Sequence, residues 1–163
     1  MNKIQDFAEL TGYNCKKITC GQFFSSTRDF YCLTCHLMKT HSLTLHCHEF
    51  YEVEIITAGT SIDTIDGMNY TLKRGDFIFL KPDNSHCLRA RDSNDAELIN
   101  LAFSTDLMNE IISFLDVECE DTLTWPITGH LPQEMISLLT DQAKQLVIPS
   151  KNVPMNVLLS SNG

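Results

Sequence analysis

The residues best able to do chemistry lie in the segment 46–52, which reads HCHEFYE. In an extended strand, residues of equal parity share a face, so His46, His48 and Glu52 point to one side and the residues between them point to the other. Two imidazoles and one carboxylate form the ligand set of a non-haem iron centre, and the same set suits zinc, nickel or manganese. In a site without a metal, these side chains would line a polar pocket and hydrogen-bond an organic ligand or one another.

Further candidates for the same site follow along the chain. His86 comes after a turn at Pro82 and offers a fourth ligand from a neighbouring strand. Glu54 shares the parity of Glu52, and a second carboxylate would suit recognition of a polyhydroxyl compound, because carboxylates accept hydrogen bonds from sugar hydroxyls. An interior that holds such groups must either pair them as neutralising ions or bind something. The candidate ligand-binding residues are His46, His48, Phe50, Glu52, Glu54 and His86, and the candidate metal ligands are His46, His48, Glu52 and His86.

The elements that must position these side chains are short strands. Residues 29–103 contain at least seven apolar or alternating runs separated by turn residues, which is typical of a sandwich or barrel. Asp66-Gly67 is a strong two-residue hairpin signal, because both central positions favour positive φ. A closed or two-sheet barrel protects the edges of so many strands. Residues 1–28 are predicted to be an irregular lead, with a short helix suggested by Ile4, Phe7 and Ala8.

In residues 104–163 the spacing of apolar residues changes from that of strands to that of helices, so we interpret this part as a helical segment. Ser104 to Asp106 are N-cap types ahead of an i, i+3, i+4 apolar stripe, and Pro132 stands where a second amphipathic helix can begin. The unburied faces of these helices are expected to pack on the barrel or on a second copy of the chain. The final residues begin a helical pattern that stops without a cap, so the chain reads as one cut short.

Composition limits the class of partner. The 163 residues are 43% hydrophobic and 20% charged, with a formal net charge of −9. A globular domain is expected, and its charge would repel a phosphate backbone. The chain shows neither a signal peptide nor a stretch long enough to span a membrane. Seven cysteines without an export signal indicate a reducing cytoplasm.

One cysteine motif is interpreted as chance. Cys32, Cys35 and His36 match the C-x-x-C-H pattern of haem attachment. This stretch alternates as a strand, however, so Cys32 and Cys35 should point to opposite faces, which disfavours a shared zinc ion or a redox pair. His41 and His130 are expected in solvated loops, and Trp125 in core or interface packing.

Two runs in the strand region repeat the residue types and spacing of known motifs. They are His46-x-His48-x3-Glu52-x6-Gly59 and Gly75-x6-Pro82-x3-His86, which resemble the two cupin motifs. The fuller pattern, with Glu97 to Phe103 as a last strand and helices after it, is most similar to the N-terminal sensor domain of AraC-type transcription regulators. This resemblance spans roughly residues 30–147. It implies a mainly β fold, a cupin-type double-stranded β-helix (jelly-roll barrel) followed by C-terminal α-helices.

The resemblance also implies a function. A small-molecule effector, such as a sugar or related metabolite, would bind inside the barrel, and the chain would form a homodimer. A helix-turn-helix domain would contact DNA, and no pair of helices with that spacing and a basic recognition helix follows residue 104. The DNA-binding part is therefore expected beyond residue 163.

Departures from the cupin pattern favour a regulator over an enzyme. Thr40 stands where the first motif usually opens with glycine. Near the second motif, enzymatic cupins usually have a glycine shortly after the proline and an asparagine beyond the histidine, whereas this chain has Asp83, Asn84 and Ala90 there. The alternative is a small metal-dependent cupin enzyme, a dioxygenase or sugar isomerase, with a Zn, Ni, Mn or Fe ion held by three histidines and one glutamate. A purely structural dimerisation module would leave the clustered imidazoles unexplained.

Overall fold

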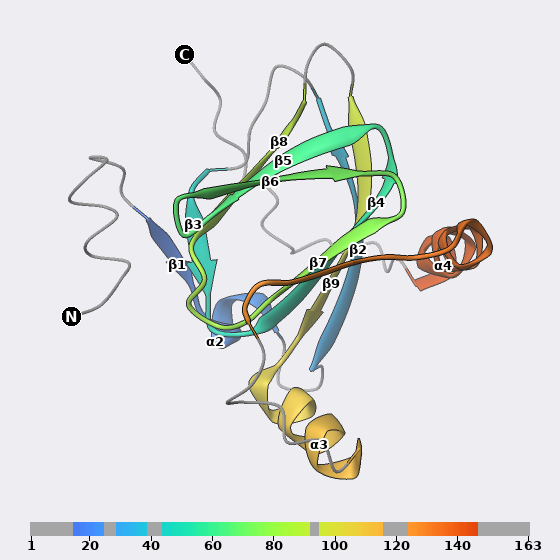
Figure 1. The fold of residues 1–163 in the computed structure, drawn as a ribbon. Coiled ribbons are helices and arrows are strands. Elements are labelled where there is room, and N and C mark those ends of the chain that lie inside the picture. Colours follow the sequence, from blue (N-terminus) through green and yellow to red (C-terminus); the bar gives the residue numbers. More distant parts are fainter. Residues whose placement is uncertain (1–14, 25–28, 39–43, 92–94, 116–123, 147–163) are drawn as a thin grey trace.

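The computed structural model describes residues 15–24, 29–38, 44–91, 95–115 and 124–146, which form two facing five-stranded sheets (Figure 1). The first sheet has the order β1-β3-β8-β5-β6. Its strands are β1 (Lys16–Ile18), β3 (His46–His48), β8 (His86–Ala90), β5 (Thr60–Ile65) and β6 (Met68–Lys73). The second sheet has the order β10-β7-β4-β9-β2. Its strands are β10 (Ile127–His130), β7 (Asp76–Leu80), β4 (Tyr51–Ala58), β9 (Ala96–Phe103) and β2 (Phe30–Leu37).

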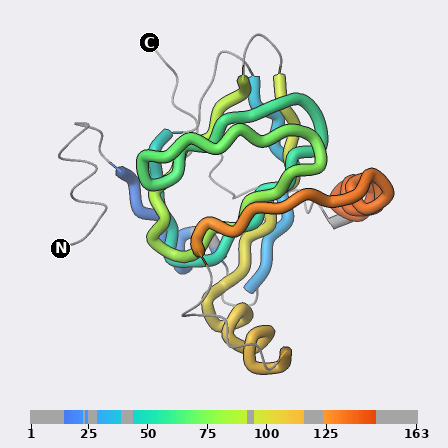
Figure 2. Tube along the Cα trace, in the orientation of Figure 1, coloured from blue at the N-terminus to red at the C-terminus, as the bar shows by residue number. Residues whose placement is uncertain are grey.

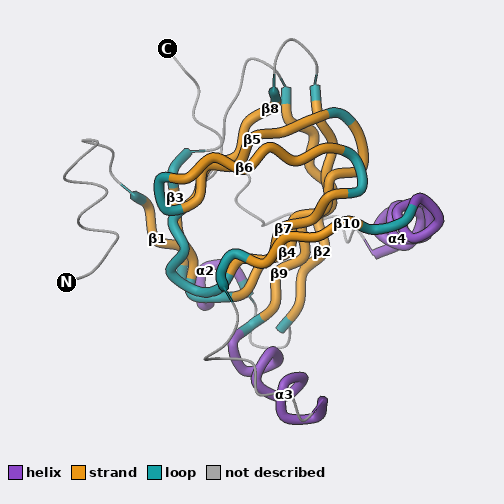
Figure 3. Tube along the Cα trace, viewed as in Figure 1, coloured by secondary structure: helices purple, strands orange, loops and turns teal. Residues whose placement is uncertain are grey.

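The strand order confirms the predicted jelly roll. Apart from the β5–β6 hairpin, neighbours in each sheet are not consecutive strands, and successive strands such as β4 and β5 belong to different sheets. This double-sheet crossover pattern is that of jelly-roll and cupin folds. Gly59 makes the corner between β4 and β5 with φ +73°, and a Cβ there would lie 2.4 Å from the Asp95 carbonyl oxygen, so only glycine fits. Figures 2 and 3 show the strands closing around a common interior.

The predicted hairpin also fixes the approach to β8. Asp66 and Gly67 both have positive φ, +47° and +84°, as expected. The Asp66 carboxylate accepts hydrogen bonds from Asn84 Nδ2 at 2.8 Å and from the backbone nitrogen and hydroxyl of Ser85, both at 2.9 Å. Because His86 is the next residue, the turn between β5 and β6 holds the start of β8 in place.

Apolar clusters fill the barrel on either side of a polar middle. Along β4 and the residue before it, the inward positions are Phe50, Glu52, Glu54 and Ile56. Ile56 belongs to the largest buried apolar cluster, and Phe50 packs with Ile18 and Ala102 at the other end. The two carboxylates therefore lie between two apolar layers.

Two longer helices follow the barrel, as predicted. Helix α3 (Thr105–Leu115) is capped by the Ser104 hydroxyl, which accepts from the Leu107 nitrogen at 3.1 Å. Helix α4 (Gln133–Leu146) begins directly after Pro132. It covers the outer face of β2, where Ile136 and Ala143 join a second apolar cluster (Figure 1). No helix in the described part of the chain is long and apolar enough to cross a membrane.

Several short elements differ from the sequence prediction. The expected irregular lead contains β1 and helix α2 (Cys20–Phe23), and β10 lies within the segment expected to be helical. His130 lies on β10 rather than in a loop, with Nδ1 2.7 Å from Asp76 Oδ1. The predicted helix around Ile4, Phe7 and Ala8, the position of His41 and the tail after 146 lie outside the described residues.

Two predictions about packing are confirmed. Cys32 and Cys35 face opposite sides of β2: Cys32 lies in the cluster beneath α4, and Cys35 packs against the interior cluster. Trp125 packs on Tyr51 and Phe79, with ring centroids 6.0 and 5.1 Å apart.

Candidate functional site

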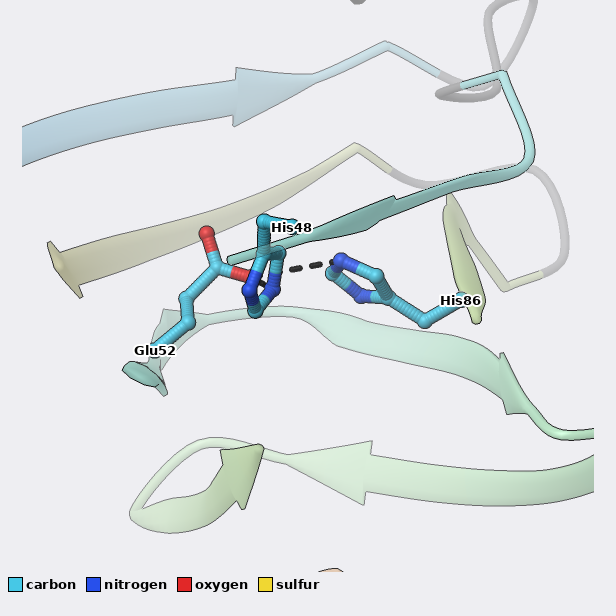
Figure 4. A group of neighbouring side chains, drawn as sticks. All are labelled: His48, Glu52 and His86. Atoms are coloured by element: carbon cyan, nitrogen blue, oxygen red, sulfur yellow. Dashed lines mark hydrogen bonds and ion pairs between the residues drawn. The ribbon is translucent and has the colours of Figure 1, made fainter. Parts of the chain in front are cut away.

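The predicted site residues come together inside the barrel from both sheets. Strand β3 pairs with β8 at His46 and His86, and β4 brings Glu52 from the facing sheet. His46, His48, Glu52 and His86 have only 3%, 0%, 5% and 1% of their surface exposed. Figure 4 shows His48 and His86 both turned towards Glu52. The geometry therefore builds one buried polar centre.

His48, Glu52 and His86, which we call the motif triad, form a compact group. Glu52 Oε2 lies 3.1 Å from His48 Nε2 and 3.3 Å from His86 Nε2. The other oxygen, Oε1, accepts from Asn100 Nδ2 at 2.5 Å. The His48 ring is oriented by a 2.6 Å contact of Nδ1 with the Phe50 carbonyl oxygen. Burial opposes ionisation of Glu52, but His48, followed by His86, outweighs burial and holds the pKa of Glu52 below its usual range.

His46 lies beside the motif triad and plays a different part. Its ring centroid is 4.2 Å from that of His86, and its Nδ1 contacts the Thr44 carbonyl oxygen at 2.8 Å. Burial, with a smaller contribution from the charge of His86, lowers the pKa of His46 to about 3. Among the described residues, His46 is not in a group whose ligand atoms all lie within 4.8 Å, so its role as a metal ligand stays a prediction.

A second group lies on the other side of His86 and includes a residue that sequence reasoning missed. Glu54, Asp63 and His86, which we call the inner triad, place their ligand atoms within 4.8 Å of one another. His86 Nδ1 lies 3.7 Å from Asp63 Oδ2 and 3.9 Å from Glu54 Oε1. Asp63 shares parity with Ser61 and Ile65, all buried on one face of β5, and that alternation was the signal available in the sequence.

Burial and mutual repulsion perturb the inner triad. Burial raises the pKa of Asp63 and of Glu54, and the neighbouring Asp63 carboxylate raises the pKa of Glu54 further. Burial alone would disfavour the imidazolium of His86. The carboxylates of Asp63, Glu52 and Glu54 outweigh this effect and raise the pKa of His86 to about 10. The polar centre is thus built around one cationic ring and three acids.

Many polar atoms of this centre have no hydrogen-bond partner. They are Glu54 Oε2, Ser61 Oγ, both oxygens of Asp63, both ring nitrogens of His86 and Asn100 Oδ1. Buried polar atoms in folded proteins are nearly always paired, with protein, water or a ligand. Most of these atoms are acceptors, so the centre favours a donor or a cation.

Phe50 connects the polar centre to a hollow at the end of the barrel. It stacks on His48 with centroids 4.4 Å apart and meets the edge of Phe24 at 5.2 Å. Phe24 lines a hollow of about 510 Å³. The other residues that line it are Cys20, Gly21, Asp29, Ser104, Thr105 and Asp106. The hollow adjoins the first turn of α3, so Phe24 links Phe50 to the residues beside that helix.

A jelly-roll barrel with a polar centre from both sheets defines a cupin-type ligand-binding domain. The family described as AraC-like ligand binding domain matches residues 29–148. The chain belongs to this family, and the expected resemblance is confirmed.

Curated relatives are regulators. The chain is 28% identical over 100 residues to the HTH-type transcriptional activator RhaS of Yersinia pestis (strain Pestoides F), and equally to that of Yersinia pseudotuberculosis (strain YPIII). The match covers 58% of this chain and 36% of RhaS, so the chain spans about a third of the length of these relatives. The family and these relatives favour the regulator over the enzyme.

Solved structures support the fold. ToxT of Vibrio cholerae O395, bound to (E)-4-(8-methylnaphthalen-1-yl)but-3-enoic acid, superposes with a TM-score of 0.58 at 12% identity. The superposition covers 77% of this chain and 50% of ToxT. ToxT of strain SCE256, bound to an unsaturated fatty acid, gives 0.55 at 13% identity, over 77% of this chain and 49% of ToxT.

Proposed function

We propose that the barrel is the effector-sensing and dimerisation domain of an AraC-type transcription regulator. The effector binds the polar centre through His46, His48, Phe50, Glu52, Glu54 and His86. The observation that carries this proposal is the set of buried polar atoms without partners, since leaving them unsatisfied costs free energy that a bound molecule would recover.

DNA contact is assigned to a part of the regulator outside residues 1–163. The net charge of −9 makes this chain a poor partner for a phosphate backbone, and the named relatives are HTH-type activators about three times as long as the matched stretch. We expect the regulator to work in the cytoplasm, where cysteine thiols stay reduced.

The charge of the centre selects the effector. Glu52, Glu54 and Asp63 supply three carboxylates, and the buried residues among those described include no lysine or arginine. A carboxylic acid, such as the two compounds bound to ToxT, would be repelled by these carboxylates. A neutral compound with several hydroxyl donors, such as a sugar, would instead satisfy the unpartnered acceptors. The proposed effector is therefore a sugar or related polyhydroxyl metabolite.

Closure of the site couples binding to a conformational change. A compound of sugar size cannot reach side chains that are at most 5% exposed unless the barrel opens locally. Movement of Phe50 would break its contacts with His48 and Phe24. A shift of Phe24 would then change the hollow beside the first turn of α3. A ligand shifts an equilibrium between two states only if it binds one of them more tightly. The closed barrel is one of these states, and the opened barrel that admits the effector is the other.

A metal at the motif triad is a second possibility within the same function. Two imidazole nitrogens and a carboxylate oxygen within 4.8 Å fit zinc, nickel, manganese or iron, held by His48, Glu52 and His86. Such an ion would coordinate hydroxyl groups of the effector. The His48–Glu52 contact of 3.1 Å already satisfies those two groups as a hydrogen bond, so direct contact with the effector is the preferred proposal.

Thermal shifts of the whole chain test the effector class. Neutral pentoses and hexoses are compared with fatty acids in the presence of a chelator, because binding to the folded state alone raises Tm with concentration. We expect a sugar to raise Tm of the wild type and of His130→Gln, an exposed-histidine control, but to have little effect on His48→Gln. A rise for fatty acids alone, or an equal rise in all three proteins, would contradict the proposal.

Dimerisation is proposed to use α4. Its inner face packs on β2 through Ile136, whereas Met135 and Leu138 remain 43% and 55% exposed. Exposed large apolar side chains on a helix covering a barrel are suited to a symmetric contact with a second copy.

A further inference from the structure

The unsatisfied atoms of the polar centre are concentrated at the inner triad rather than at the motif triad. His48 and Glu52 hydrogen-bond each other. His48 also bonds to the Phe50 carbonyl oxygen, and Glu52 also accepts from Asn100. By contrast, Glu54 Oε2 and both oxygens of Asp63 have no hydrogen-bond partner, although Glu54 and Asp63 are 1% and 0% exposed. The demand for a ligand therefore falls on residues outside the motif.

The spacing of the inner triad fits an ion rather than direct contact. His86 Nδ1 is 3.7 Å from Asp63 Oδ2 and 3.9 Å from Glu54 Oε1, which is too far for a hydrogen bond. Two ligands that share one metal at about 2.1 Å lie about 3 to 4 Å apart. Because all three ligand atoms lie within 4.8 Å of one another, an ion fits among them in this closed arrangement, whereas an organic molecule would require the barrel to open.

Charge points the same way. Glu54 and Asp63 are adjacent acids, and His86 is the one basic side chain paired with them in the described residues. That single ring also faces Glu52, so it cannot neutralise three carboxylates. A divalent cation would compensate the two inner acids.

We propose that Glu54, Asp63 and Nδ1 of His86 form a binding site for one divalent cation, with Mn²⁺ the best match to the donors. Carboxylate oxygens favour Mg²⁺, Ca²⁺ and Mn²⁺, and an imidazole nitrogen favours transition metals, so Mn²⁺ satisfies both preferences. Ser61 Oγ, buried on the same face of β5 as Asp63, is available as a further oxygen.

In this arrangement Glu52 is not a ligand of the ion but orients the His86 ring that binds it. With an ion on Nδ1, the proton of the neutral His86 ring resides on Nε2, which faces Glu52 Oε2 at 3.3 Å. Metal-bound histidines usually donate their other ring N–H to such a carboxylate, which orients the ring. A neutral imidazole offers one lone pair, so an ion at the inner triad and an ion at the motif triad compete for His86.

The test is Mn²⁺ binding to the whole chain by equilibrium dialysis and electron paramagnetic resonance, without sugar. We expect about one Mn²⁺ per chain. Asp63→Asn should weaken binding by at least roughly tenfold, as loss of a ligand does, whereas His48→Gln should change it little. Asp76→Asn, which removes a half-buried acid outside the barrel centre that is also paired with a histidine, is the matched control and should bind as the wild type does.

Pulsed measurements on the wild type keep the test independent of variant folding. The inner triad predicts coupling of Mn²⁺ to one imidazole nitrogen, and the motif triad would give two. Two nitrogens, loss of binding in His48→Gln but not in Asp63→Asn, or no bound Mn²⁺ would overturn the proposal. Circular dichroism checks that Asp63→Asn folds, and Glu54→Gln replaces it otherwise. Since sugar binding is measured with a chelator, failure of this site and failure of the proposed function are distinguishable.

Discussion

His86 is the residue on which the polar centre depends. One ring nitrogen faces Glu52, and the other faces Glu54 and Asp63. The motif and parity predicted that His48, Glu52, Glu54 and His86 would meet, because alternation along a strand is local information. Asp63 was not predicted, because its place beside His86 depends on the register of β5 against β8, which pairs residues more than twenty positions apart.

His46 gives a pH dependence of stability with a definite sign. Its pKa is about 3 in the folded protein and near 6.5 when unfolded, so between these values the unfolded chain binds a proton that the folded protein does not. Its contribution is therefore lost as pH falls below 6.5. We expect the free energy of unfolding to drop between pH 7.5 and pH 5 by roughly 2 kcal/mol more in the wild type than in His46→Gln.

Urea denaturation at the two pH values measures this difference. The other titrating groups of the centre are present in both proteins, so the comparison isolates His46. Equal pH dependence in wild type and variant would show that the buried ring is already charged.

At the scale of elements, turns position the site. Strands β2 to β9 were predicted because their alternating residues, and the Gly or Pro residues at their ends, are local features of the sequence, as at Asp66-Gly67. β1 and β10 were not predicted because three or four residues carry little pattern, and they form only by pairing with β3 and β7. The same limit applies to the four-residue α2.

Asp66 should therefore matter more than a surface acid. Asp66→Ala removes three hydrogen bonds that hold Asn84 and Ser85 at the entry to β8, and it places alanine at positive φ. We expect a loss of about 2 kcal/mol of unfolding free energy by urea denaturation. Asp141→Ala, at an exposed pair with Lys144, should change it by less than about 0.5 kcal/mol. Equal losses in the two variants would argue against a positioning role for the turn.

At the scale of the whole molecule, the fold and family were predicted from motif spacing and strand density, and the acidic charge predicted only the kind of partner. The position of α4 over β2 could not be predicted, because the apolar stripe of a helix fits a barrel or a second chain equally well. Its inner face packs on β2, and its exposed outer residues are the proposed contact with a second copy.

Disruption of that outer face should separate the copies. We expect Leu138→Asp to give a monomer by size-exclusion chromatography with light scattering, because a buried charge opposes association. Phe114→Asp, which alters an exposed apolar residue of α3, should leave the dimer intact. A monomeric wild type, or dimer loss only in Phe114→Asp, would remove α4 from the interface.

The most direct measurement is a crystal structure of the chain grown with the sugar that raises its Tm most. We expect the sugar inside the barrel, with its hydroxyl groups on the acids and imidazoles of the polar centre and with Phe50 displaced. Sugar bound only outside the barrel, with the buried histidines and acids unchanged, would contradict a ligand-binding role for the barrel interior.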